Sequence, residues 1–159
     1  MGTRLCLFSA LIAASMLTSS VSADEQTLKF RVVMTEVGGS MNDVAAYKGH
    51  AMGAQKFAGA AVFEDGRMAY KTVVALMDIA DENVSYSGYS TYMFQNGDVL
   101  VVKFTGGGTI HNNGGDYEVV SGKGVYKGAT GAGRFDSVKN PWQDADMFQG
   151  SISVKLAGG

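Results

Sequence analysis

Cysteine, proline and histidine are scarce in this chain, which has one cysteine, one proline and two histidines among 159 residues. The single cysteine, Cys6, has no disulfide partner within the chain, so the folded part must gain its stability from packing. Neither His50 nor His111 belongs to a spacing of histidines, cysteines and carboxylates that is typical of zinc sites. We therefore expect both histidines to be solvated loop residues, and we expect no metal and no other cofactor.

An excess of basic charge is also absent. The chain has 13 lysine and arginine residues against 15 aspartate and glutamate residues, for a formal net charge of -2 at pH 7. Acidic and basic residues are interspersed, and no basic run occurs. This pattern does not favour nucleic acid or an anionic membrane surface as a partner.

The first residues have the organisation of an export signal. Arg4 precedes an apolar stretch over residues 5–17, and small and polar residues follow up to Ala23. This order of a charged, an apolar and a small-residue region predicts a signal peptide that is cut after Ala23. The apolar stretch is shorter than the about 20 residues of a transmembrane helix. Cys6 precedes the apolar stretch, whereas a lipid-anchored cysteine would follow it.

Two segments are therefore predicted. Residues 1–23 form the signal peptide, and residues 24–159 form a single domain, because the remaining length fits one domain of ordinary size. We expect the protein to be exported, either to the periplasm or into the medium, and to carry no membrane anchor.

Most of the chain after the signal alternates between apolar and polar residues with a period of two, which is typical of β-strands. The dipeptides Asp65-Gly66 and Asn96-Gly97 predict two hairpins with type I′ turns. We expect a break at Gly38-Gly39, a loop with at most a short helical turn over residues 40–50, and a bulge or turn at residues 106–108. The predicted strands cover residues 28–37, 51–64, 67–79, 83–95, 98–110, 116–120 with a continuation toward 124, 129–138 and 147–156.

Seven or eight strands of this length predict a closed sheet. They exceed the usual strand length of about 5 to 6 residues, and an open antiparallel sheet would leave two long edges prone to aggregation. Closure into an all-β, antiparallel, eight-stranded barrel removes both edges. The interior of such a barrel is either filled by side chains or wide enough for one small ligand.

The segment over residues 122–135 resembles the glycine-rich signature of the allene oxide cyclase-like barrels and of the related dirigent proteins. Their G-x-G-x-[FY]-x-G-A-x-G pattern is matched by Gly122, Gly124, Tyr126, Gly128, Ala129 and Gly131. The resemblance implies a calycin-like eight-stranded barrel with a mainly apolar cavity, Tyr126 as a plug at one end, and assembly as a homodimer or homotrimer. The early carboxylate and asparagine motif of the cyclases has no counterpart here, so only the fold is carried over.

Aromatic and hydroxylic residues form the most suggestive candidate site. Tyr86, Tyr92 and Phe94 share one face of a predicted strand, and Tyr70 and Asp78 share one face of the strand before it. If these faces line a cavity, the tyrosines can orient a ligand, and a carboxylate in an apolar pocket gains a raised pKa suited to proton transfer. The alternative is that the tyrosines cap the barrel ends or fill an oligomer interface with their hydroxyls in water, because aromatic residues generally supply packing area first.

The sequence leaves three functions open. The leading hypothesis is an exported barrel that binds a small apolar or aromatic ligand through Tyr70, Tyr86, Tyr92, Phe94 and Tyr126. The second is a cyclase or isomerase of the allene oxide cyclase or dirigent type. The third is a non-catalytic interaction protein.

For the enzymatic hypothesis, we predict Asp78 or Glu118 as the carboxylate that handles the proton. We also expect Trp142, which follows Pro141 in the late loop, to close one end of the barrel.

Overall fold

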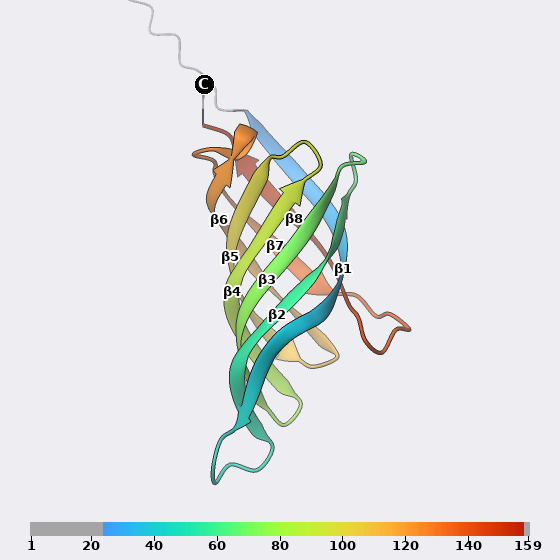
Figure 1. Cartoon of the computed structure of the whole chain (residues 1–159), viewed down its shortest axis with the longest axis vertical. Helices are drawn as coiled ribbons and strands as arrows, with labels where there is room; N and C mark the ends of the chain where they lie inside the picture. Colours follow the sequence, from blue (N-terminus) through green and yellow to red (C-terminus); the bar gives the residue numbers. More distant parts are fainter. Residues whose placement is uncertain (1–23, 158–159) are drawn as a thin grey trace, which may run out of the picture.

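The computed structural model describes residues 24–157, which form a closed barrel of eight antiparallel strands (Figure 1). Each strand pairs with its neighbours in chain order, and β1 pairs with β8 to close the ring. The predicted fold class is therefore confirmed. The elements are β1 Glu25–Asp43, β2 His50–Phe63, β3 Met68–Ala80, β4 Asn83–Phe94, β5 Val99–Thr109, β6 Asn112–Lys123, the 3₁₀ turn η1 Gly124–Tyr126, β7 Thr130–Ser137 and β8 Asp146–Lys155.

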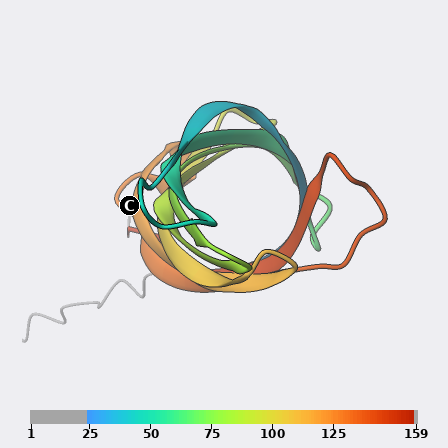
Figure 2. The same ribbon diagram turned by 90° about the horizontal axis from the view of Figure 1, so that it is seen from below.

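The connections alternate between the two ends of the barrel because consecutive strands are antiparallel. What we call the upper end, at the top of Figure 1, holds the start of β1, the end of β8, η1 and the turns after β2 and β4. The lower end holds the loops that follow β1, β3, β5 and β7. Figure 2, seen from below, shows the strands as a ring, with the loop over residues 138–145 extending sideways from it.

The predicted alternation along the strands is present, and one face of each strand forms the core. In β1, the inward residues Leu28, Phe30, Val32 and Met34 are all buried. In β8, Ile152 and Val154 are fully buried, and they alternate with polar residues that face outward. Successive side chains of a strand point to opposite faces of the sheet, so one face of each strand fills the barrel.

Both predicted hairpins are present, but their predicted turn type is wrong. Gly66 and Gly97 have positive φ angles of 85° and 88°, whereas Asp65 and Asn96 do not belong to the positive-φ residues. A type I′ turn needs positive φ at both central residues. Instead, the Gly66 amide donates to the Phe63 carbonyl, which makes a type I turn with the glycine in the following left-handed position.

The predicted end of the first strand at Gly38-Gly39 is also wrong. β1 continues to Asp43, and the pairing with β2 shifts by one residue between Glu36 and Gly38. This shift is a β-bulge, which bends a strand without ending it. A side chain at Gly39 would collide with the Ala54 carbonyl, so the glycine allows β1 and β2 to stay paired. The predicted loop over residues 40–50 is thereby reduced to residues 44–49.

Candidate functional site

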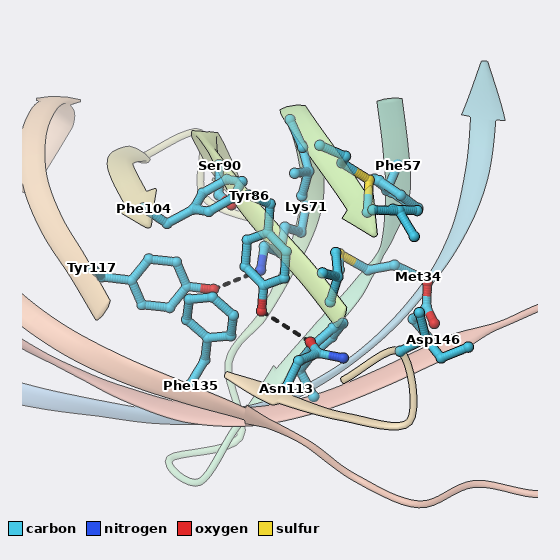
Figure 3. Close-up of a pocket in the computed structure, with 17 residues that line it drawn as sticks. Met34, Phe57, Lys71, Tyr86, Ser90, Phe104, Asn113, Tyr117, Phe135 and Asp146 are labelled. Atoms are coloured by element: carbon cyan, nitrogen blue, oxygen red, sulfur yellow. Dashed lines mark hydrogen bonds between the residues drawn. The ribbon is translucent and has the colours of Figure 1, made fainter. Parts of the chain in front are cut away.

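A cavity of about 160 Å³ occupies the lower half of the barrel interior (Figure 3). An eight-stranded barrel leaves space of this order only where side chains do not meet across it. An apolar cavity of about 150 Å³ is large enough to hold benzene, so this one matches a single aromatic ring. Its lining consists of Met34, Phe57, Lys71, Val73, Ala75, Met77, Ile79, Val84, Tyr86, Ser90, Phe104, Ile110, Asn113, Tyr117, Phe135, Asp146 and Phe148.

Aromatic rings form one wall of the cavity. The rings of Tyr86 and Phe135 stack with centroids 6.2 Å apart, and Phe104 packs edge-on against Phe135 at 6.1 Å. Glycines make room for them, because a side chain at Gly106 would collide with the Tyr86 ring and a Cβ at Gly115 would lie 2.9 Å from Phe135 Cζ. The glycines over residues 106–108 are therefore part of β5, not the predicted bulge or turn.

The floor of the cavity carries a buried lysine. Lys71 projects inward from β3 and is only 2% exposed. Its ammonium donates a hydrogen bond to the Tyr117 hydroxyl at 3.0 Å, and the Tyr92 hydroxyl donates to the same oxygen at 3.5 Å. The ammonium also lies 5.1 to 5.7 Å from the ring centroids of Phe30, Tyr92 and Tyr117. These cation–π contacts partly offset its loss of hydration.

Two tyrosines of the interior resist deprotonation. Burial raises the pKa of Tyr92 well above the ordinary tyrosine value, and the neighbouring Tyr117 adds to the effect. Burial also raises the pKa of Tyr86. The Tyr86 hydroxyl donates to the Asn113 side-chain oxygen at 2.9 Å and to the Gly114 carbonyl at 3.2 Å. Both tyrosines therefore act as neutral hydroxyl groups at physiological pH.

The mouth of the cavity is acidic. Asp146, at the start of β8, lies at the rim, and burial raises the pKa of its carboxyl above the ordinary value, with the Glu36 carboxylate adding to the shift. Glu36 itself accepts a hydrogen bond from the Gln55 side chain at 3.2 Å. The cavity therefore has the Lys71 ammonium at its floor and the Asp146 carboxyl at its rim, with the exposed Glu36 close enough to influence Asp146.

The upper half of the interior is packed solid. Tyr126 is fully buried, and its ring lies 5.3 Å from that of Phe94, as expected for the plug that the glycine-rich segment implied. The Tyr126 hydroxyl accepts a hydrogen bond from Arg67 at 2.8 Å, and the Arg67 guanidinium lies over the Phe94 ring. Burial raises the pKa of Tyr126, while Arg67 opposes this shift.

Four of the predicted ligand-binding residues lie inside the barrel, but they do not form one site. Tyr86 lines the cavity, and Tyr92 is buried at its floor behind Tyr117. Phe94 and Tyr126 belong to the packed upper half. Among these four, only Tyr86 contributes surface to the cavity.

The remaining predicted site residues face outward. Tyr70 is 54% exposed, and Glu118 is exposed on β6. Asp78 lies on the outer side of β3, where its carboxylate is 2.6 Å from Nε2 of His50. None of these three side chains lines the cavity. Their roles in ligand binding or proton transfer stay predictions. His50 begins β2 and has this carboxylate partner, which corrects its expected place as a solvated loop residue.

Sequence reasoning missed Lys71, Tyr117 and Phe135. One signal for Lys71 was available, because it stands at an inward position of β3 between Ala69 and Val73. A lysine at such a position is buried, and buried lysines are rare unless they are paired with an opposite charge. The lysine at this position therefore marks a candidate functional residue. Trp142 was expected to close one end, but it is 54% exposed in a loop that extends away from the ring.

Within residues 24–157, histidine and carboxylate side chains nowhere gather in a group of three or more that could hold a metal ion. In the same part of the chain, no helical segment has the length and hydrophobicity of a membrane-spanning helix.

The comparisons with known proteins concern the fold. The sequence matches no protein-family model and no curated protein. Two pterocarpan synthase dirigent proteins have similar structures. The first has a TM-score of 0.57 at 14% identity and covers 93% of this chain and 100% of its own, and the second has a TM-score of 0.54 at 13% identity over 87% and 99%.

A protein of unknown function from the DUF3224 family of Shewanella oneidensis is also similar, with a TM-score of 0.50 at 16% identity over 86% of this chain and 98% of its own. The chain therefore has the fold of the dirigent-like barrels, as the glycine-rich segment suggested. At these identities the likeness concerns the fold alone.

Proposed function

We propose that this barrel binds a small aromatic or apolar molecule in the cavity of its lower half. The observation that carries the proposal is the size and lining of that cavity, which matches one ring and has Tyr86, Phe104 and Phe135 along one wall. Ligand sites are typically apolar cavities with a few polar groups that fix orientation. Lys71 and Tyr117 supply such groups at the floor.

Toluene is a suitable probe because it is apolar and of one-ring size. We expect it to shift the amide NMR signals of residues around Tyr86 and Phe135 and to raise the melting temperature through binding to the folded state. Ala75→Phe fills the cavity and should abolish both effects, because Ala75 faces it. Leu76→Phe is the matched control, since Leu76 faces outward and is 65% exposed. Absence of any effect of toluene and of benzoate on the unchanged protein would contradict the proposal.

A second candidate function is an isomerase or cyclase. Two barrels with this fold are named pterocarpan synthases, and the hydrogen-bonded pair of Lys71 and Tyr117 places proton donors inside an apolar cavity. A fatty-acid epoxide, the substrate of the plant cyclases, exceeds a one-ring cavity. The substrate for such chemistry would therefore be a one-ring ketone or a similarly small molecule.

Deuterium uptake from heavy water into the methyl group of acetophenone tests this second function. Uptake that Tyr117→Phe abolishes would assign the chemistry to the cavity. Uptake that Asp78→Asn or Glu118→Gln abolishes would support the carboxylates predicted from the sequence. No uptake above the rate without protein would remove this candidate for one-ring ketones.

Export is part of the proposed function. The predicted signal peptide lies outside the described residues. Its predicted cut after Ala23 leaves the barrel complete, because the first hydrogen bond of the structure joins the Leu156 amide to the Asp24 carbonyl at 3.0 Å. N-terminal sequencing of protein from the periplasm and the culture medium should find Asp24 as the first residue. An N-terminus at Met1 in the cytoplasmic fraction alone would refute export.

The outer side of β2 to β4 supports self-association as a homodimer or homotrimer. We call this surface the outer apolar face. Outward residues of soluble barrels are normally polar, and an apolar patch of this kind is typical of an interface. Its large side chains are 38% to 65% exposed, and they are Met52, Val62, Met68, Tyr70, Val74, Leu76, Tyr89 and Met93.

Light scattering after gel filtration tests the self-association. We expect a dimer or trimer for the unchanged protein and a monomer for Leu76→Lys. The control is Gln149→Lys on the outer side of β8, which should keep the assembly. A monomer at all concentrations of the unchanged protein would contradict the proposal.

A further inference from the structure

The floor of the cavity holds an uncompensated positive charge. Lys71 is 2% exposed, yet among residues 24–157 no carboxylate forms an ion pair with its ammonium. The Tyr117 hydroxyl and three ring faces attract the ammonium, but they carry no net charge. A buried charge is costly unless an opposite charge is paired with it. The site is therefore electrostatically prepared for an anion.

The two polar groups at the floor have the geometry that a carboxylate needs. The Lys71 nitrogen and the Tyr117 oxygen are 3.0 Å apart and both line the cavity (Figure 3). The Tyr117 oxygen accepts hydrogen bonds from Lys71 and from Tyr92, so its own hydrogen remains to be donated. Two adjacent donors, one of them charged, can each bind one oxygen of the same carboxylate.

The acidic mouth restricts the other end of the ligand. A ring whose carboxylate lies at Lys71 directs its opposite end toward the rim, where Asp146 lies under the influence of the nearby Glu36. A second carboxylate at that end would approach the like charge of Asp146, which is unfavourable even though Asp146 is exposed to solvent. A neutral or amine-bearing end would not be repelled there.

We infer that the ligand of this cavity is a small aromatic monocarboxylic acid, with its carboxylate bound by Lys71 and Tyr117 and its ring packed against the wall that Tyr86 and Phe135 form. This inference rests on the proposed function, since it names the ligand class of the same cavity.

Binding of four probes to the unchanged protein tests the inference by calorimetry and NMR at one pH and salt concentration. Benzoate should bind at least about tenfold more tightly than benzamide and toluene, because a charged hydrogen bond in a buried site is stronger than a neutral one. Terephthalate, with a second carboxylate, should bind more weakly than benzoate. If toluene binds as tightly as benzoate, the monocarboxylate inference is overturned while the proposed function stands. If no probe binds, both are wrong.

Substitutions then test where the carboxylate of benzoate binds. Lys71→Met should reduce benzoate affinity about tenfold or more and reduce toluene affinity by a much smaller factor, because it removes the charge but keeps the length and apolar volume of the side chain. Tyr117→Phe should reduce benzoate affinity by a smaller factor. Lys103→Met on the outer side of β5 is the matched control and should change neither affinity.

Benzoate affinity that survives Lys71→Met would refute the assignment to Lys71. The comparison of benzoate with benzamide on the unchanged protein tests the ligand class even if a variant fails to fold.

Discussion

The two halves of the barrel interior are built from similar side chains but packed differently. In the upper half, Leu100, Tyr126 and Val154 have no exposed surface. In the lower half, the inward rings of Phe57, Tyr86 and Phe148 are only partly buried and border the cavity. One barrel can therefore gain its stability from one half and keep space for a ligand in the other.

The ends of the barrel explain this difference. At the upper end, Tyr126 fills the interior and Arg67 lies across it with bonds to Tyr126 and Asp65. At the lower end, the long loop after β7 extends sideways and does not cover the mouth. The comparison teaches that closing a ring of strands does not by itself fill the ring. Tyr126 of the turn η1, together with strand residues such as Leu100 and Val154, fills the upper half.

Truncating an apolar side chain in each half should give the largest difference in the free energy of unfolding. Leu100→Ala should lower the free energy of unfolding by about 2 to 5 kcal/mol, because Leu100 is fully buried and leaves a cavity. Ile110→Ala at the lower end should cost about 1 kcal/mol or less, because Ile110 is 47% exposed. Urea unfolding measures both values. Equal losses would show that the two halves are packed alike.

Enlarging a buried alanine in each half should have the next largest effect. Ala61→Leu should destabilise the barrel by about 1 to 3 kcal/mol, because Ala61 is fully buried in the packed region and the added atoms must displace neighbours. Ala75 lines the cavity, so the larger side chain of Ala75→Leu can extend into open space. This substitution should change the free energy of unfolding by less than about 1 kcal/mol. Thermal unfolding distinguishes the two. A large loss for Ala75→Leu would contradict an open lower half.

Removal of the side chain that covers the upper end should have a moderate effect. Arg67→Met loses the hydrogen bonds to Tyr126 and Asp65 and should cost about 1 to 2 kcal/mol in urea unfolding. Arg134→Met is the control, because its pair with Asp116 is highly exposed and should contribute little. If both substitutions have the same small effect, Arg67 does not stabilise the upper end.

The smallest expected effect is an opposite pH dependence at the two ends. Hydrogen bonds from Arg67 lower the pKa of Asp65 below its ordinary value of 3.8, so its contribution to stability is present above pH 3.8 and is lost as the pH falls through the lower, folded-state pKa. Burial raises the pKa of Asp146 above 3.8. Its ionised form therefore destabilises the folded state, and this cost disappears as the pH falls through the raised pKa.

Urea unfolding of single variants between pH 3 and pH 7 measures this contrast. At pH 7, Asp65→Asn should be less stable than the unchanged protein and Asp146→Asn more stable, each by a few tenths of a kcal/mol, which is usual for exposed charges. Both differences should shrink in acid. Differences of the same sign at pH 7 would contradict the assigned shifts.

Much of the fold could be predicted because its signals are local. Alternation along residues 28–34 and residues 148–156 separated the two faces of the first and last strands, and Asp65-Gly66 marked a hairpin. The site was less accessible. Tyr86, which the sequence singled out as a candidate ligand-binding residue, lines the cavity, whereas Asp78 stands on the outer side of β3.

The sequence by itself determined the strands, the hairpins and the two faces of each strand, because a period of two and a glycine turn depend on neighbouring residues. Only the tertiary structure decided which inward residues meet. Lys71 and Tyr117 are 46 positions apart, and strand register around the closed ring brings them within 3.0 Å. The type of each turn, the direction of the loop after β7 and the solid upper half likewise depend on contacts between distant segments, which no local pattern encodes.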